Sequence, residues 1–222
     1  MKKLATILLA SIAFVACTQT KKNETTIEHL QQPVKSTFTI HETYDTGEYM
    51  PVIAKYAPEN SFRTAFNDKP MVGFVTAADT ARFMEAMRTD SLRMALPEDC
   101  QVMLAQFKTD VPEEEGETYA VYLIKMSESQ SLQNPTLDDI YVSNETFAGH
   151  AVIELQFSEK DAKRWAKMTR QNIGKPVAFV MGNRALCAPR VNMEIENGAS
   201  TISAPFTREE ACAIVDEIIG RK

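Results

Sequence analysis

The feature that most constrains the fold is the stretch RQNIGKPVAFVMGNRALCAP at residues 170–189, which passes from a helix end into a strand and a tight turn. Gly174 tolerates the left-handed backbone that closes many helices. Pro176 cannot continue a helix but suits the first residue of a strand. The apolar run 177–181 predicts that strand, and the Gly-Asn pair after it fits a two-residue hairpin turn. We therefore predict a helix, a strand, a hairpin turn and a return strand.

Three short apolar segments in the sequence are each followed by the signature of a helix start. This signature, the capping box, places a hydroxyl residue three positions before an acid, and it occurs at 76–79, 158–161 and 207–210. Apolar residues at helical spacing follow each box. The distances between the three units are irregular, which argues against a repeat protein. We predict an α+β fold with mostly antiparallel sheets and helices packed on one face.

Strand-like runs account for much of the rest. Residues 71–75, 101–108, 119–126 and 151–157 predict strands, and the acidic residues 112–117 predict a solvated hairpin turn. Over residues 151–219 the predicted order is strand, helix, three strands and a final helix. The predicted core of this part consists of Trp165, Phe179, Ile202, Ile214 and Ile218.

The first residues have the layout of an export signal. Lys2 and Lys3 precede an uncharged apolar run at 4–16, which is shorter than the ~20 residues of a membrane-spanning helix. The run ends in a small residue followed by Cys17, an arrangement that resembles the lipobox of bacterial lipoproteins, in which this cysteine is acylated. We predict a lipoprotein signal peptide at 1–16 and lipid attachment at Cys17. The alternative is an ordinary secretory signal with a chance cysteine.

Composition along the chain predicts its organisation. Residues 17–36 combine the acylated cysteine with a polar, aperiodic stretch and predict a flexible tether. Residues 37–69 contain a strand-like run at 37–40 and a second run at 50–57 that is interrupted by prolines, and the elements of this region stay open. A polar, turn-rich boundary at 128–150 separates a predicted subdomain at 70–142 from a second one at 151–222.

The charge balance excludes some partners. Loss of Lys2 and Lys3 with the signal leaves 22 basic residues against 30 acidic ones, a net charge of −8. An acidic chain without basic clusters argues against nucleic acid and anionic lipid as main partners. We predict a protein held at a membrane surface by its lipid and facing the periplasm.

The sequence carries no recognisable catalytic or metal-binding pattern. His29, His41 and His150 are scattered, and the adjacent acids Asp138 and Asp139 fit a solvated loop. No zinc spacing, calcium loop, phosphate-binding loop or serine-nucleophile motif occurs. We therefore predict that the protein is not an enzyme, with no catalytic residues, cofactor, metal or small-molecule substrate.

Two groups of sulfur-containing residues allow two interpretations each. The three cysteines after Cys17 are an odd number, so at least one thiol stays free. The last two lie among apolar residues and fit small buried hydrophobes, although an exported compartment also permits a disulfide between them. A cluster of three methionines fits flexible core packing, or an adaptable apolar groove for peptides. The residues concerned are Cys100, Cys187 and Cys212, and Met84, Met87 and Met94.

Residues 151–219 resemble the periplasmic head subdomain of the bacterial protein-export factors SecD and SecDF. More weakly, residues 70–142 resemble the base subdomain that precedes the head in that family. The resemblance to the head rests on order and spacing over about 70 residues, at Phe157-Ser158, residues 169–175 (TRQNIGK), Ala188-Pro189, Ile202-Ser203 and residues 206–211 (FTREEA).

This resemblance implies a SecDF head-like fold and contact with polypeptide leaving the export channel. The family's transmembrane helices, which carry its proton-driven movement, have no counterpart here, so only a binding role carries over. We predict a non-catalytic envelope lipoprotein that contacts exported or unfolded polypeptide in protein export. The alternative is an accessory or regulatory lipoprotein that docks on a folded envelope partner such as full-length SecDF.

The outer membrane is favoured over the inner membrane, because Thr18 replaces the aspartate that commonly retains lipoproteins at the inner membrane. Replacing Cys17 with Ala should release the protein from the membrane fraction, because the substitution removes the acylated residue. Cell fractionation followed by immunoblotting measures this release. A Thr18→Ala variant serves as the control, and a Cys17→Ala protein as membrane-bound as its parent would contradict the lipid anchor.

Overall fold

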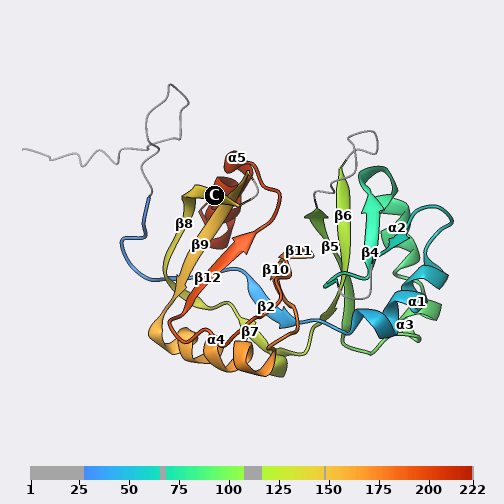
Figure 1. The fold of residues 1–222 in the computed structure, drawn as a ribbon, viewed down its shortest axis with the longest axis horizontal. Coiled ribbons are helices and arrows are strands. Elements are labelled where there is room, and N and C mark those ends of the chain that lie inside the picture. The colour runs from blue at the N-terminus through green and yellow to red at the C-terminus, as the bar shows by residue number, and fades with distance from the viewer. Residues whose placement is uncertain (1–27, 66–68, 108–116, 148, 222) are drawn as a thin grey trace, which may run out of the picture.

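The structure, a computed structural model, describes residues 28–65, 69–107, 117–147 and 149–221. Cys17, the signal peptide 1–16 and most of the acidic turn 112–117 lie outside these ranges. The described strands form three antiparallel sheets arranged along the longest axis of the molecule (Figure 1). No helix in the described ranges has the length and apolar character needed to cross a membrane.

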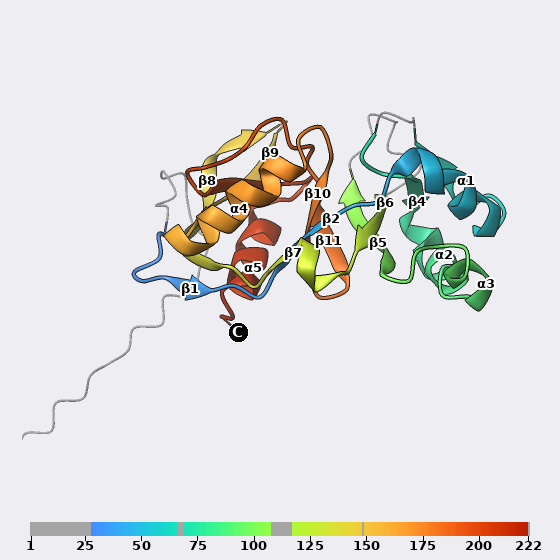
Figure 2. The ribbon, with the colours of Figure 1, turned by 90° about the horizontal axis from the view of Figure 1, so that it is seen from below.

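Sheet A has the strand order β1-β8-β9-β12. The two helices packed beside it are α4 and α5; α5 contacts β8 and β9, and α4 lies along the opposite side of the molecule (Figures 1 and 2). The elements are β1 (Val34–Lys35), β8 (Thr136–Phe147), β9 (His150–Phe157), β12 (Ala199–Ser203), α4 (Glu159–Gln171) and α5 (Arg208–Ile218).

Sheet C forms the other end of the molecule and has the order β3-β4-β6-β5. Helices α1, α2 and α3 lie on its outer side (Figure 2). The elements are β3 (Arg63–Thr64), β4 (Gly73–Thr76), β5 (Cys100–Phe107), β6 (Thr118–Lys125), α1 (Thr46–Tyr56), α2 (Thr80–Ala86), α3 (Asp90–Arg93) and the 3₁₀ turn η1 (Ala77–Asp79).

Sheet B lies between the other two and joins them. Its order is β11-β10-β2-β7, with β2 (Thr39–Glu42), β7 (Ser131–Gln133), β10 (Val177–Met181) and β11 (Arg184–Cys187); the 3₁₀ turn η3 (Glu128–Gln130) precedes β7.

Every residue of β10 is buried. Val177, Phe179 and Met181 belong to a core shared with sheet A and α4, whereas Ala178 and Val180 belong to a core shared with sheet C. The continuous apolar run 177–181 therefore reflects a strand that is covered on both faces.

The order predicted for residues 151–219 is confirmed. It appears as β9, α4, β10, β11, β12 and α5, and Trp165, Phe179, Ile202, Ile214 and Ile218 are all buried. Gly174 has a φ of 81° just after α4. Gly182 has a φ of 58° in the hairpin turn. The α+β class with antiparallel sheets is confirmed as well.

The boundary predicted at 128–150 is wrong, because these residues contain η3, β7 and the long strand β8. Residues 137–142, predicted to belong to the 70–142 subdomain, pair with β9 in sheet A. The pairing register shifts between Leu137 and Asp139 and again between Val142 and Thr146. These irregularities break the alternation of polar and apolar residues by which a strand is recognised in sequence.

The prediction of a flexible tether at 17–36 is wrong for its last part, because residues 28–36 lie against sheet A. Val34 and Lys35 form β1, and the Ser36 amide donates to the Pro135 carbonyl at 3.0 Å. The open region 37–69 contains β2, α1 and β3. Pro51 lies inside α1 and does not end it.

Only one of the three predicted capping boxes forms in full. At Thr207 the side chain accepts from the Glu210 amide, and the Glu210 carboxylate accepts from the Thr207 amide. At Ser158 no side-chain cap bond forms. The acid of this box, Asp161, does not reach back to the cap residue either, because its carboxylate accepts from the Thr136 amide at 2.8 Å and from Arg164 at 2.7 Å. In the first box the Thr76 hydroxyl donates to the Asp79 carboxylate rather than binding a backbone amide.

These caps predict unequal effects of two similar substitutions. Thr207→Ala should lower the free energy of unfolding by about 1 kcal/mol, because it removes a cap hydrogen bond from the start of α5. Ser158→Ala, the matched control, should change it by less than about 0.5 kcal/mol, because no cap bond is lost there. Urea unfolding followed by circular dichroism measures both, and equal losses in the two variants would contradict the assignment.

Candidate functional site

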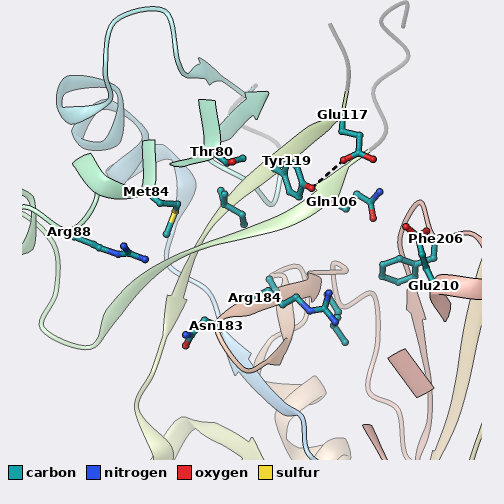
Figure 3. A pocket seen from close by; sticks show the side chains of 13 residues that line it. Thr80, Met84, Arg88, Gln106, Glu117, Tyr119, Asn183, Arg184, Phe206 and Glu210 are labelled. Carbon is teal, nitrogen blue, oxygen red and sulfur yellow. Dashed lines mark hydrogen bonds between the residues drawn. The ribbon is translucent and has the colours of Figure 1, made fainter. Parts of the chain in front are cut away.

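A cleft of about 560 Å³ lies between the sheet C end of the molecule and the β10–β11 hairpin (Figure 3). Its residues come from segments far apart in the sequence: α2, β5 and the start of β6 on one side, and the hairpin and the start of α5 on the other. The structure therefore creates here a concave surface that no single sequence segment contains.

One wall is built from α2 and sheet C. Thr80 and Met84 are four residues apart on one face of α2, and Arg88 lies in the turn that follows this helix. On β5, Leu104 and Gln106 line the cleft, while the alternating residues Met103 and Ala105 are buried in the core. The alternation of a β-strand thus presents one apolar and one amide side chain to the cleft.

Tyr119 stands at the centre of the polar part of this wall. It is the cross-strand partner of Gln106, and its hydroxyl donates to the Glu117 carboxylate at 3.4 Å (Figure 3). Burial raises the pKa of Tyr119, and the carboxylates of Glu117 and Glu210 raise it further. Tyr119 and Glu210 line the cleft from opposite walls, and the phenol keeps its proton as a hydrogen-bond donor.

The opposite wall is supplied by the β10–β11 hairpin and the start of α5. Arg184 pairs with Glu217 at 3.1 Å, so its charge is partly compensated. Phe206 is buried and precedes the helix cap. The Glu210 carboxylate is held by the Thr207 amide at 2.8 Å and the Thr207 hydroxyl at 3.0 Å. A negative charge at a helix start is favourable, because the amide groups there point toward it.

The cleft offers hydrogen-bond donors, acceptors and apolar surface, which suit binding. Among the described residues, no group of three or more histidine, cysteine or acidic side chains is placed to hold a metal. Burial raises the pKa of the Cys100 thiol to about 12, with a further contribution from Asp99. Burial likewise raises the pKa of Cys187 to about 12. Both thiols are therefore protonated and poor nucleophiles at neutral pH.

The residues singled out in the sequence are distributed over the molecule. Met84 lines the cleft, Met87 is buried in the core and Met94 is 83% exposed, so the methionines do not form one groove. Cys187 and Cys212 are not joined in the described structure. Asp139, expected to be solvated, accepts hydrogen bonds from the amides of Leu30 and Ile140.

Sequence reasoning missed the principal cleft residues, which are Gln106, Glu117, Tyr119, Asn183, Phe206 and Glu210. The box at 207–210 identified Glu210 as a helix cap, but not as part of a site. For the others, the sequence contained no signal of proximity, because their meeting depends on how sheets B and C pack.

Away from the cleft, sheets B and C are linked through a buried histidine. His41 on β2 is 1% exposed. Its Nδ1 lies 2.9 Å from the Lys125 carbonyl oxygen on β6, and its Nε2 lies 2.8 Å from the Thr39 hydroxyl. A carbonyl can only accept, so Nδ1 donates and Nε2 accepts from Thr39. Burial lowers the pKa of His41, and the bond to the Lys125 carbonyl opposes that shift in part.

The chain can now be compared with known proteins. Residues 106–215 match the model of the SecDF P1 head subdomain family. The chain is 27% identical over 143 residues to the protein translocase subunit SecD of Rhodothermus marinus, covering 64% of this chain and 22% of that protein. It is 36% identical over 66 residues to the protein translocase subunit SecDF of Thermus thermophilus, covering 30% of this chain and 9% of that protein.

Among solved structures, the chain is similar to a membrane component SecDF that enhances protein export, with a TM-score of 0.37 and 21% identity. That similarity covers 82% of this chain and 60% of the other chain. The chain spans less than a quarter of the curated relatives it matches. The family match shows that it contains a SecDF head-like domain, which extends from β5 into α5 and includes most of the cleft residues.

The buried histidine generates a pH prediction. Folding lowers the pKa of His41 below its unfolded value of about 6.5. As the pH falls, this histidine is therefore protonated in the unfolded chain before it is protonated in the folded chain. The free energy of unfolding should therefore fall as pH drops below about 6.5, with a slope of at most ~1.4 kcal/mol per pH unit from this group. Urea unfolding between pH 7.5 and 5.5 measures the slope.

In His41→Gln the amide can still donate to the Lys125 carbonyl, but it does not titrate. The slope should be smaller in this variant than in the parent. Equal slopes in the two proteins would contradict a role for His41.

Proposed function

We propose that this chain is an envelope lipoprotein that holds exported, unfolded polypeptide as a non-catalytic binding module. The observation that carries the proposal is the cleft between sheet C and the β10–β11 hairpin, most of which falls within the SecDF head-like domain. The relatives with this domain are named as protein translocase subunits, so an exported polypeptide is the natural ligand class.

The composition of the cleft suits a ligand of variable sequence. Gln106, Tyr119 and Asn183 supply groups that can bind the backbone of an extended chain, which is common to all polypeptides. Met84 and Leu104 supply apolar surface, and methionine adapts its shape to different side chains. Charges of both signs line the walls, at Arg88 and at Glu210. This mixture favours weak, adaptable binding over recognition of one small molecule.

The proposed setting is the periplasmic face of a membrane, with the outer membrane favoured. The support is the apolar run at 4–16, the small residue before Cys17, and Thr18 after it. A lipid at Cys17 would hold the head-like domain at a membrane surface that faces the periplasm, the compartment into which exported chains are released. No proton-driven step is assigned to this chain, and its contribution is binding alone.

The proposal is tested by crosslinking in living cells. A photoactivatable residue in place of Gln106 lies in the cleft, and the same residue in place of Lys167, exposed on the outer face of α4, is the matched control. We expect many unrelated exported chains to be captured at position 106 and few at position 167. Tyr119→Ala in the same background should reduce capture several-fold, because it removes a hydroxyl donor and an aromatic surface from the cleft.

Each other outcome contradicts the proposal in a different way. A single stoichiometric protein captured at position 106 would identify the chain as a docking module for a folded partner. Equal capture at positions 106 and 167 would remove the cleft as the binding site. No capture, together with turnover of a small molecule by the purified protein, would overturn the binding role.

A further inference from the structure

Residues 28–35, called the strap here, lie along the edge of sheet A. Val34 pairs with Leu137 and Lys35 with Thr136, both antiparallel, and β1 is the only described strand that pairs with β8 on this edge. Towards its N-terminal end the strap continues beside β8, where the Leu30 amide donates to Asp139 at 3.0 Å. The contacts of the strap thus reach from Thr136 to Tyr141, the first half of the 12-residue strand β8.

The strap is held by few side chains. Leu30 and Val34 are partly buried and pack against the core of sheet A. A bend at Gln31 and Gln32 separates the two side chains. His29 contacts Asp139, with 2.5 Å from Nδ1 to Oδ2, and its ring meets the Tyr141 ring edge-on at 4.6 Å between centroids.

The rest of the strap contributes little. Glu28, Gln31, Gln32, Pro33 and Lys35 are exposed. Short pairing, exposed side chains and an edge location are the features of a segment that opens at low free-energy cost.

An edge strand presents backbone amides and carbonyls that can pair with any extended chain. The strap shows what this edge accepts: an antiparallel segment with two apolar side chains four residues apart. Because the strap belongs to the same chain, it competes with an external segment at an effective concentration of about millimolar. It can therefore cover the edge when no polypeptide is present and yield to one that is.

We propose that the strap is a releasable cover, and that exported polypeptide adds to the β8 edge as an antiparallel strand after displacing it. This inference rests on the proposed function, but it assigns a second binding surface, distinct from the cleft. The strap acts as an internal mimic of the ligand, and it makes binding at this edge depend on strap release.

The test uses the full mature chain and a fluorescein-labelled peptide with the strap sequence EHLQQPVKS. Leu30→Ser combined with Val34→Ser loosens the strap by removing its two apolar contacts. Gln31→Ser combined with Gln32→Ser is the matched control, since both glutamines are exposed. Fluorescence anisotropy should show peptide binding at least tenfold tighter to the loosened chain than to the parent, because a larger fraction has an open edge. The control should bind like the parent.

A locked variant keeps the test decisive if loosening disturbs the fold. Lys35→Cys with Thr136→Cys places two thiols on directly paired residues, where a disulfide can form. The oxidised protein should not bind the peptide, and reduction should restore parental binding. An unfolded exported protein should displace the labelled peptide from the loosened chain.

Equal peptide binding by the parent, loosened and locked chains would overturn the strap proposal. Failure of the unfolded protein to compete would overturn the assignment of polypeptide to this edge. Neither result concerns the cleft, because crosslinking at position 106 reports on it separately. Loss of that crosslinking, with strap-dependent peptide binding intact, would instead contradict the proposed function.

Discussion

The burial of β10 on both faces is the interaction on which the rest of the structure depends. Its larger side chains, Val177, Phe179 and Met181, enter the core with sheet A and α4, while Ala178 and Val180 enter the core with sheet C. A strand shared in this way cannot shift its register without exchanging the two sets of side chains. Close packing therefore fixes the position of the two ends of the molecule relative to each other.

The cleft follows from this arrangement. The β10–β11 hairpin belongs to sheet B and lies across the cleft from Gln106 and Tyr119 of sheet C. The distance between the two walls is therefore set by the packing of sheets B and C. The polar groups of the cleft are held independently of any ligand, since Glu210 caps α5 and Arg184 pairs with Glu217. A site preorganised in this way loses less conformational freedom when it binds.

Much of the second half of the chain could be predicted from sequence, because its signals are local. The stop at Gly174, the apolar run 177–181 and the Gly-Asn turn each act within a few residues, and the structure contains all of them. Prediction failed where a distant partner decided the outcome. Asp161 has the right spacing for a capping box, yet its carboxylate accepts a hydrogen bond from the Thr136 amide instead. The shifted pairing of β8 and the docking of Leu30 on Asp139 likewise depend on residues over a hundred positions away or on another strand.

The sequence by itself determined the class of the fold, the order of elements from β9 to α5, and the apolar residues of that core, because these follow from local backbone preferences and the burial of apolar surface. The tertiary structure alone decided which sheet each early strand joins, where the cleft lies, and that residues 28–35 cover the β8 edge. The physical reason is that these features are contacts between segments distant in sequence. Their free energy depends on the packing of the three sheets and not on the propensities of the residues that meet there.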